Sequence, residues 1–118
     1  MRKILLGLCA ILLFYAPAAT SAYTGNELLS HCEQTHQIGE GFCMGFIYGV
    51  DEGFYAAEFL YRRPKPEEKI YCKPANVTAG QMKDIVIQYL RQNPQTRHQP
   101  AGIPVLESFQ GAFPCRRG

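Results

Sequence analysis

The chain has 118 residues, with 12 lysines and arginines against 10 acidic residues, which is enough for one hydrophobic core and too short for two domains. Its charge is nearly balanced, and no basic stripe is interleaved with aromatic residues, which argues against nucleic acid as a partner. No polybasic amphipathic segment points to a membrane surface either.

The first 22 residues have the features of a secretory signal peptide. Arg2 and Lys3 precede an apolar run at 4–16, and small residues flank Ser21. The run is shorter than the roughly 20 residues that a membrane-spanning helix needs, so we expect cleavage rather than anchoring. The expected organisation is therefore a leader at 1–22 and one periplasmic domain at 23–118, with no membrane segment after cleavage. That domain keeps 10 basic and 10 acidic residues, so its net charge is near zero.

Four cysteines remain after the leader is removed: Cys32, Cys43, Cys72 and Cys115. An even number of cysteines in an exported chain indicates disulfides, each worth about 2–4 kcal/mol in a small domain. We expect all four to be oxidised in two bonds. Three pairings are open, and the spacing does not choose between them.

The first structural segment, 25–32, has the apolar spacing of a short amphipathic helix. Thr24 or Asn26 is expected to cap it. The break before the next segment is predicted from Gln37, Gly39 and Gly41.

The second segment, about 40–61, combines a broad apolar face with a row of glycines at strict four-residue spacing. The expected apolar face comprises Phe42, Phe46, Val50, Phe54 and Ala57, and the glycine row comprises Gly41, Gly45, Gly49 and Gly53. Each glycine costs a helix about 0.5–1 kcal/mol relative to alanine, which favours a row that lets another helix, or the same helix of a second subunit, approach closely. Three carboxylates, Asp51, Glu52 and Glu58, argue against a membrane-spanning helix. The alternative is an irregular helix whose glycines serve turns.

Residues 62–69 contain two prolines among six charged side chains, which a helix interior does not accommodate. The segment is predicted to be an exposed loop. It is either a solvated connector or a protruding loop that contacts a partner, because binding residues concentrate on loops held by a rigid scaffold. The candidate contact residues are Arg62, Arg63, Glu67 and Glu68.

The third segment has the clearest start, because Thr78 and Gln81 form a capping box. An apolar stripe at helical spacing follows, made of Met82, Ile85, Val86, Tyr89 and Leu90. Asn93 and Pro94 are expected to end this helix.

The last segment carries an apolar face made of Val105, Leu106, Phe109, Ala112 and Phe113. Its start is less sharply defined, since Pro100, Gly102 and Pro104 are expected to delay helical pairing. All four segments have helical period and none alternates at period two, so the predicted fold is all-α, a small four-helix domain with two disulfides.

The residues that chemistry requires are scarce, and no enzyme is predicted. The mature chain has only Ser30 and Ser108 as serines, and no nucleophile elbow, phosphate-binding glycine loop or zinc-protease motif. A cysteine–histidine pair would need Cys43 or Cys115 with His98, and oxidation would remove the thiolate. The cluster of His31, Cys32, His36 and Cys43 lacks the spacing of a zinc finger, so we expect no metal and no cofactor.

Taken together, short motifs along nearly the whole mature chain resemble the Rap/Tai family of immunity proteins. They are Leu28-Leu29-x-x-Cys32, Phe42-Cys43-x-Gly45-Phe46-Ile47-x-Gly49, Cys72-x-Pro74, Val77-Thr78-x-Gly80-Gln81, Val86-x-x-Tyr89-Leu90-x-x-x-Pro94 and Ala112-Phe113-Pro114-Cys115. The resemblance implies a small helical periplasmic protein, often dimeric, that inhibits a peptidoglycan amidase toxin delivered by a type VI secretion system. It implies that the inhibitor docks over the active-site groove of the toxin. The chain departs from the usual pattern at Gly102 and Pro104 and in its charged segment at 62–69.

Two other functions are compatible with such a domain. One is a periplasmic stress or chaperone-like binding protein with no toxin partner, which would open at acid pH to expose apolar surface. The other is a structural or envelope-assembly protein.

Overall fold

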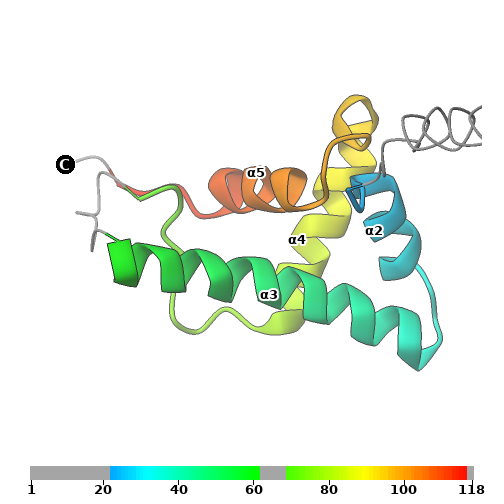
Figure 1. Ribbon diagram of the computed structural model, residues 1–118, viewed down its shortest axis with the longest axis horizontal. Helices are drawn as coiled ribbons and strands as arrows, with labels where there is room; N and C mark the ends of the chain where they lie inside the picture. The colour runs from blue at the N-terminus through cyan, green and yellow to red at the C-terminus, as the bar shows by residue number, and fades with distance from the viewer. Residues whose placement is uncertain (1–21, 62–68, 117–118) are drawn as a thin grey trace, which may run out of the picture.

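The computed structural model describes residues 22–61 and 69–116 of the chain. Four α-helices follow one another, α2 (Gly25–Cys32), α3 (Gln37–Tyr61), α4 (Ala79–Gln92) and α5 (Gly102–Ala112), with a short 3-10 helix, η2 (Pro94–Thr96), between α4 and α5 (Figure 1). Two disulfides cross-link the domain. In these residues the only β-type pairing is an isolated bridge between Thr24 and Pro100. The predicted all-α, four-helix domain with two disulfides is confirmed.

Both predicted helix caps are formed by threonines. At the start of α2, the Thr24 side chain accepts from the Glu27 amide at 3.4 Å, and the Glu27 carboxylate accepts from the Thr24 amide at 2.7 Å. At the start of α4, the Thr78 side chain accepts from the Gln81 amide at 3.2 Å, and Gln81 accepts from the Thr78 amide at 2.7 Å. These reciprocal bonds satisfy amides that have no partner within the helix. The cap of α2 is therefore Thr24 and not Asn26.

Helix α3 is longer and more regular than its glycine content suggests. It begins at Gln37, so Gln37 and Gly39 belong to it and the break after α2 occupies only residues 33–36. Because α3 runs without interruption to Tyr61, the alternative of an irregular helix is wrong. At 1.5 Å per residue it spans about 37 Å. No helix in the described part of the chain, α3 included, is both long and apolar enough to cross a bilayer.

Prolines near α5 do not delay this helix, contrary to expectation. Pro104 is its third residue and lies in the first turn, where a backbone amide would have no acceptor within the helix. The ring is fully buried and packs with the core instead. Val105 and Phe109 are buried as predicted, whereas Ala112 is exposed.

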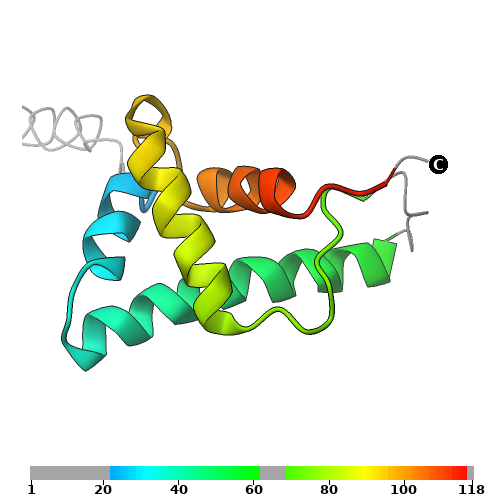
Figure 2. The ribbon, with the colours of Figure 1, turned by 180° about the vertical axis from the view of Figure 1, so that it is seen from behind.

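The core lies where α4 crosses the other helices. Figure 2 shows α4 in front of α3, while α5 runs beside the same helix. Eleven buried apolar residues form one cluster: Leu28, Leu29, Cys32, Cys43, Ile47, Met82, Val86, Leu90, Ala101, Val105 and Phe109. Three of them, Met82, Val86 and Leu90, come from the predicted stripe of α4, which confirms that this stripe faces the core. Helices α3 and α4 each contact all three of the other α-helices.

The start of the domain is fastened to the segment that leads into α5. The Ala101 amide donates to the Tyr23 carbonyl at 2.7 Å, and the Gly25 amide donates to the Gln99 carbonyl at 3.1 Å. A Cβ atom at position 25 would lie 3.0 Å from the Arg97 carbonyl oxygen, which is tighter than ordinary contact. Any larger residue at position 25 would have to displace the backbone at Arg97 slightly, so glycine suits this crossing.

Candidate partner-binding surface

One side of α3 is largely exposed and is unusually apolar, and of its residues Phe42 also contacts the rings of Tyr23 and His31. Its residues recur every three or four positions, which places them on one face of the helix. We call this surface the α3 exposed face; it comprises Ile38, Gly41, Phe42, Gly45, Tyr48, Gly49, Glu52, Gly53, Tyr55, Ala56, Phe59 and Leu60. Exposed fractions of its large apolar side chains range from 42% for Tyr48 to 84% for Ile38. Glu52 is the one charged residue in this set. The helix therefore exposes a long apolar stripe, and such a stripe is typical of interaction surfaces.

The opposite side of α3 enters the core along a line of residues four apart: Gly39, Cys43, Ile47 and Asp51. The predicted core face, centred on Phe42, Phe46 and Val50, is rotated from this line. Phe42 is 46% exposed, while Phe46 and Val50 are half-buried. The disulfide at Cys43 explains the rotation, because it fixes this residue against α2.

The glycine row lies in the open on the α3 exposed face. A Cβ atom built at Gly41, Gly45, Gly49 or Gly53 would meet nothing within 4 Å beyond the neighbouring turns of its own helix. No other part of the described chain therefore packs closely on the row. Close packing against a second subunit stays a prediction.

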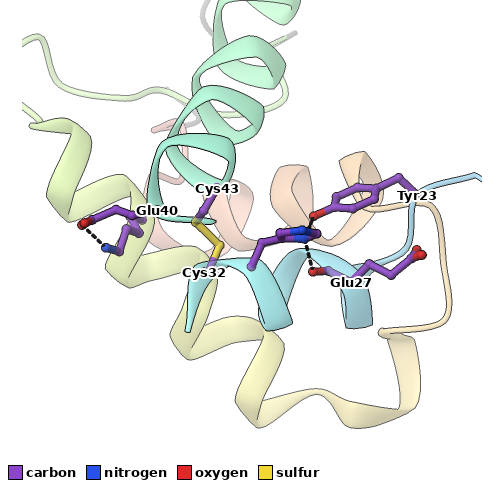
Figure 3. Close-up of a disulfide and its surroundings, with 7 residues drawn as sticks. Tyr23, Glu27, Cys32, Glu40 and Cys43 are labelled. Atoms are coloured by element: carbon purple, nitrogen blue, oxygen red, sulfur yellow. Dashed lines mark hydrogen bonds and ion pairs between the residues drawn. A yellow bond between two sulfur atoms is a disulfide. The ribbon is translucent and has the colours of Figure 1, made fainter. Parts of the chain in front are cut away.

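All four candidate cysteines are oxidised, in the pairs Cys32–Cys43 and Cys72–Cys115. The first, which we call the core disulfide, joins the end of α2 to α3 and is almost completely buried (Figure 3). The second, the strap disulfide, joins residues 69–75 to the chain beyond α5, and both of its residues are half-buried. We call residues 69–75 the strap. The Cys72 amide also donates to the Phe113 carbonyl at 2.8 Å, which reinforces the same junction.

The histidine and cysteine cluster near the core disulfide is occupied by other contacts. The Nδ1 atom of His31 lies 2.8 Å from the Tyr23 hydroxyl and 2.9 Å from the Glu27 carbonyl oxygen (Figure 3). Burial, with a smaller effect from the Glu27 charge, raises the pKa of Tyr23. Within residues 22–61 and 69–116 no three acidic, histidine or cysteine side chains are grouped so that they could hold a metal ion.

A buried carboxylate joins α3 to the strap. Asp51 is only 5% exposed. Its two oxygens accept from the Tyr71 hydroxyl at 2.7 Å and from the Lys73 ammonium at 2.5 Å. Burial, the hydrogen bond to Asp51 and the nearby carboxylates raise the pKa of Tyr71 far above its usual range. A buried charge of this kind needs both partners, so the contact fixes the strap against the C-terminal half of α3.

The strap and α3 enclose a groove of about 410 Å³. Its walls include Glu52, Phe54, Tyr55 and Glu58 from α3, and Lys69, Tyr71 and Lys73 from the strap. Lys69 lies 4.0 Å from Glu58, the outer limit of an ion pair, and both side chains reach solvent. Asp51 also lines the groove, which thus places three carboxylates beside three aromatic rings.

The predicted contact residues Arg62, Arg63, Glu67 and Glu68 lie outside the described residues. In the sequence they lie between Tyr61, the last residue of α3, and Lys69, the first residue of the strap. Lys69 is exposed beside Glu58.

The cysteines and serines named above as possible nucleophiles do not form a catalytic site. Cys43 and Cys115 are both in disulfides, so neither supplies a thiolate to His98. Ser108 is buried, and its hydroxyl donates to the Val105 carbonyl at 2.6 Å. Ser30 is exposed on α2.

Sequence reasoning missed the contact between Asp51, Tyr71 and Lys73. A partial signal was available, because Asp51 continues the buried line of Cys43 and Ile47 at four-residue spacing. A carboxylate on a buried face requires a partner. Its partners lie 20 and 22 residues away, on a segment without regular structure, and no local pattern identifies them.

Comparison with known proteins identifies the family. The sequence profile of the family described as Rap1a immunity proteins matches residues 24–115, which covers all four helices and both disulfides. No curated protein and no solved structure shows a significant match to the chain. A match over most of the chain is decisive, and it agrees with the resemblance carried by the cysteine and glycine motifs. The chain belongs to the Rap1a immunity protein family.

Proposed function

We propose that the protein is a periplasmic immunity protein that binds and inhibits a peptidoglycan amidase toxin delivered by a type VI secretion system. The observation that carries this proposal is the family match over residues 24–115. In this role the protein performs no reaction and acts by occupying the surface of the toxin.

The physical properties of the domain support such a role. A stoichiometric inhibitor loses less entropy on docking when its binding surface is already rigid. Two disulfides and the buried contact of Asp51 with the strap provide that rigidity. The α3 exposed face and the adjacent groove provide apolar and charged surface for recognition.

The toxin-binding residues are proposed to be Arg62, Arg63, Glu67 and Glu68, with the end of α3 beside them. Leu60 and Tyr61 precede the segment and are 73% and 82% exposed, and Ile70 follows it at 41%. Large exposed apolar side chains on both flanks of a charged segment fit an interface with an apolar centre and a polar rim.

A growth assay tests the function directly. A peptidoglycan amidase encoded beside this gene would be exported to the periplasm of a test bacterium, with and without this protein. The proposal expects lysis without the protein and normal growth with it, together with a stable complex in gel filtration. Alanine substitution of all four contact residues should restore lysis, and undiminished protection by that variant would remove the assignment of those residues. Failure of the unsubstituted protein to bind or protect would reject the function itself.

Self-association through the glycine row is a second element of the proposal. The row is open, and apolar side chains such as Ile38 and Phe42 flank it, which suits close approach of another helix. Replacement of Gly45 and Gly49 by leucine should shift the protein from dimer to monomer in sedimentation velocity. Both positions have free space for a side chain, so the fold should persist and circular dichroism provides the control. A species unchanged from the parent would show that the row is not an interface.

The α3 exposed face also supports the alternative of a chaperone-like binding protein, since such proteins bind apolar segments of many clients. Binding of a hydrophobic dye separates the two. A steep gain in dye fluorescence between neutral and acid pH, together with suppression of client aggregation, would favour the chaperone. An unchanged signal and one tight partner would favour the immunity protein.

A further inference from the structure

We propose that the groove between α3 and the strap binds one positively charged side chain, lysine or arginine, presented by the partner protein. This inference rests on the proposed function, because it names the chemistry by which the toxin is recognised at this end of the molecule. It commits the groove to a basic group of another protein rather than to a second copy of this chain.

The charges that line the groove carry the argument. Asp51, Glu52 and Glu58 contribute three negative charges, and Lys69 and Lys73 contribute two positive charges. Lys73 points inward, where its ammonium binds Asp51 and lies 3.7 Å from the Met82 sulfur. Lys69 is held only loosely by Glu58, at 4.0 Å. The groove therefore keeps a surplus negative charge at Glu52 and Glu58 that an incoming cation would neutralise.

The helix that forms one wall adds to this negative potential. Helix α3 contains four acidic residues, and none of its residues is basic. Within the residues that the structure describes, its last turn, at the groove end, contains no basic side chain. Burial is the main cause of the raised pKa of Tyr71, and the hydrogen bond to Asp51 and the charges of Asp51, Glu58 and Glu52 raise this pKa further, which agrees with a negative potential at the strap wall.

The aromatic lining suits a cation more than a neutral polar group. Phe54 and Tyr71 lie with their ring centroids 6.2 Å apart, and Tyr55 stands at the rim with 66% of its surface exposed. Aromatic faces attract ammonium and guanidinium groups by about 0.5–1 kcal/mol at exposed sites. At about 410 Å³ the groove falls at the lower end of the size range of small-ligand sites, which suits one side chain.

Among residues 22–61 and 69–116, a second copy of this chain offers few cations that are not already in ion pairs. Residues 22–61 and 69–116 contain six lysines and arginines, and four of these already form ion pairs: Lys69, Lys73, Lys83 and Arg91. Of the other two, Arg97 is half-buried and Arg116 is exposed. The α3 helix of a second copy would bring further carboxylates, which repel those of the groove.

The test uses the full chain and a small probe. N-acetyl-arginine amide is titrated into the labelled protein and followed by amide NMR shifts, with N-acetyl-citrulline amide as the uncharged analogue of the same shape. The proposal expects saturable shifts at residues 52–58 and 69–75 with the arginine probe and none with the citrulline probe. The double variant Glu52→Gln and Glu58→Gln should lower the affinity for the arginine probe by about fivefold to tenfold, which is the effect expected from losing two partly exposed ion pairs.

A matched control and one further variant make each outcome decisive. Glu33→Gln with Glu40→Gln removes the same charge from exposed residues outside the groove and should leave probe binding unchanged. Equal shifts with both probes, or equal losses in both double variants, would overturn the proposal. A third variant changes Arg62, Arg63 and Lys65 to glutamine. If this variant binds the probe and the unsubstituted protein does not, the chain's own segment fills the groove and the proposal is also wrong. Toxin inhibition is measured in a separate assay, so a negative result with the probe does not reject the proposed immunity function.

Discussion

The two disulfides fasten regions that differ in how they are otherwise held together. Cys32 and Cys43 are 5% and 0% exposed and lie within the apolar cluster. Cys72 and Cys115 are half-buried and join the strap to the chain beyond α5, where polar contacts such as Asp51 with Lys73 supply the remaining attachment. The core disulfide therefore reinforces packing that already exists, whereas the strap disulfide holds one wall of the groove in place. Different cross-links therefore hold the apolar core and the wall of the groove.

The largest effect is expected from removing the core disulfide. Cys32→Ala with Cys43→Ala should lower the free energy of unfolding by about 4 kcal/mol, because about 3 kcal/mol of chain entropy returns to the unfolded state and buried sulfurs leave unfilled space. Urea unfolding followed by circular dichroism measures the change. A loss smaller than that in the strap variant below would contradict the contrast between the two regions.

The strap disulfide closes a longer loop, of 43 residues, yet its removal should cost less. Loop closure alone gives about 4 kcal/mol, but the freed strap and chain end also gain motion in the folded state, so we expect about 2 kcal/mol for Cys72→Ser with Cys115→Ser. Hydrogen exchange should show faster exchange in the strap and at residues 113–116, with α2 and α4 unchanged. Loss of protection throughout the domain would show that this cross-link also supports the core.

A smaller effect is expected from the ion pair that seats the strap. Lys73→Met leaves Asp51 with Tyr71 as its remaining partner and should cost about 1–2 kcal/mol, reduced from the value for a fully buried pair because a quarter of the Lys73 side chain is exposed. The double variant with Asp51→Asn should recover part of that loss, because no buried charge remains. Thermal unfolding of the unsubstituted protein, the two single variants and the double variant gives the coupling energy between Asp51 and Lys73. Additive losses would mean that the pair does not seat the strap.

The smallest expected effect is electrostatic and comes from the ion pair between Glu40 of α3 and Lys83 of α4. The ion pair and hydrogen bond with Lys83, at 2.9 Å, hold the pKa of Glu40 below its ordinary value of 4.5. A lowered carboxyl pKa stabilises the folded state above the unfolded pKa, and this contribution is lost as the pH falls through the folded pKa. Glu40→Gln should therefore lower Tm slightly at pH 7 and leave it unchanged in strong acid. A difference that persists in acid would rule out the carboxylate charge as its cause.

Sequence alone predicted the features that depend on neighbouring residues. The capping box of Thr78 with Gln81 and the stripe of Met82, Val86 and Leu90 each lie within a few turns of one helix, and their local geometry determines them. The oxidation of four cysteines followed in the same way from their number and the expected export.

Features that depend on distant residues were not predictable. The pairing of Cys72 with Cys115 and the contact of Asp51 with Lys73 join segments 43 and 22 residues apart. The exact face that α3 buries was also missed, since Cys43 turns it toward α2 and leaves Phe42 at the surface.

The start of α5 was misjudged for a local reason, because Pro104 weakens a helix interior but is harmless in a first turn.

The strap disulfide also determines where the chain leaves the folded domain after α5. Cys115 is tied to the groove wall, whereas residue 22 enters beside α2 at the opposite end of the molecule (Figures 1 and 2). A fluorophore, affinity tag or surface anchor joined ahead of residue 22 therefore leaves the groove accessible. The same group placed after Cys115 would stand next to it and obstruct a docking protein.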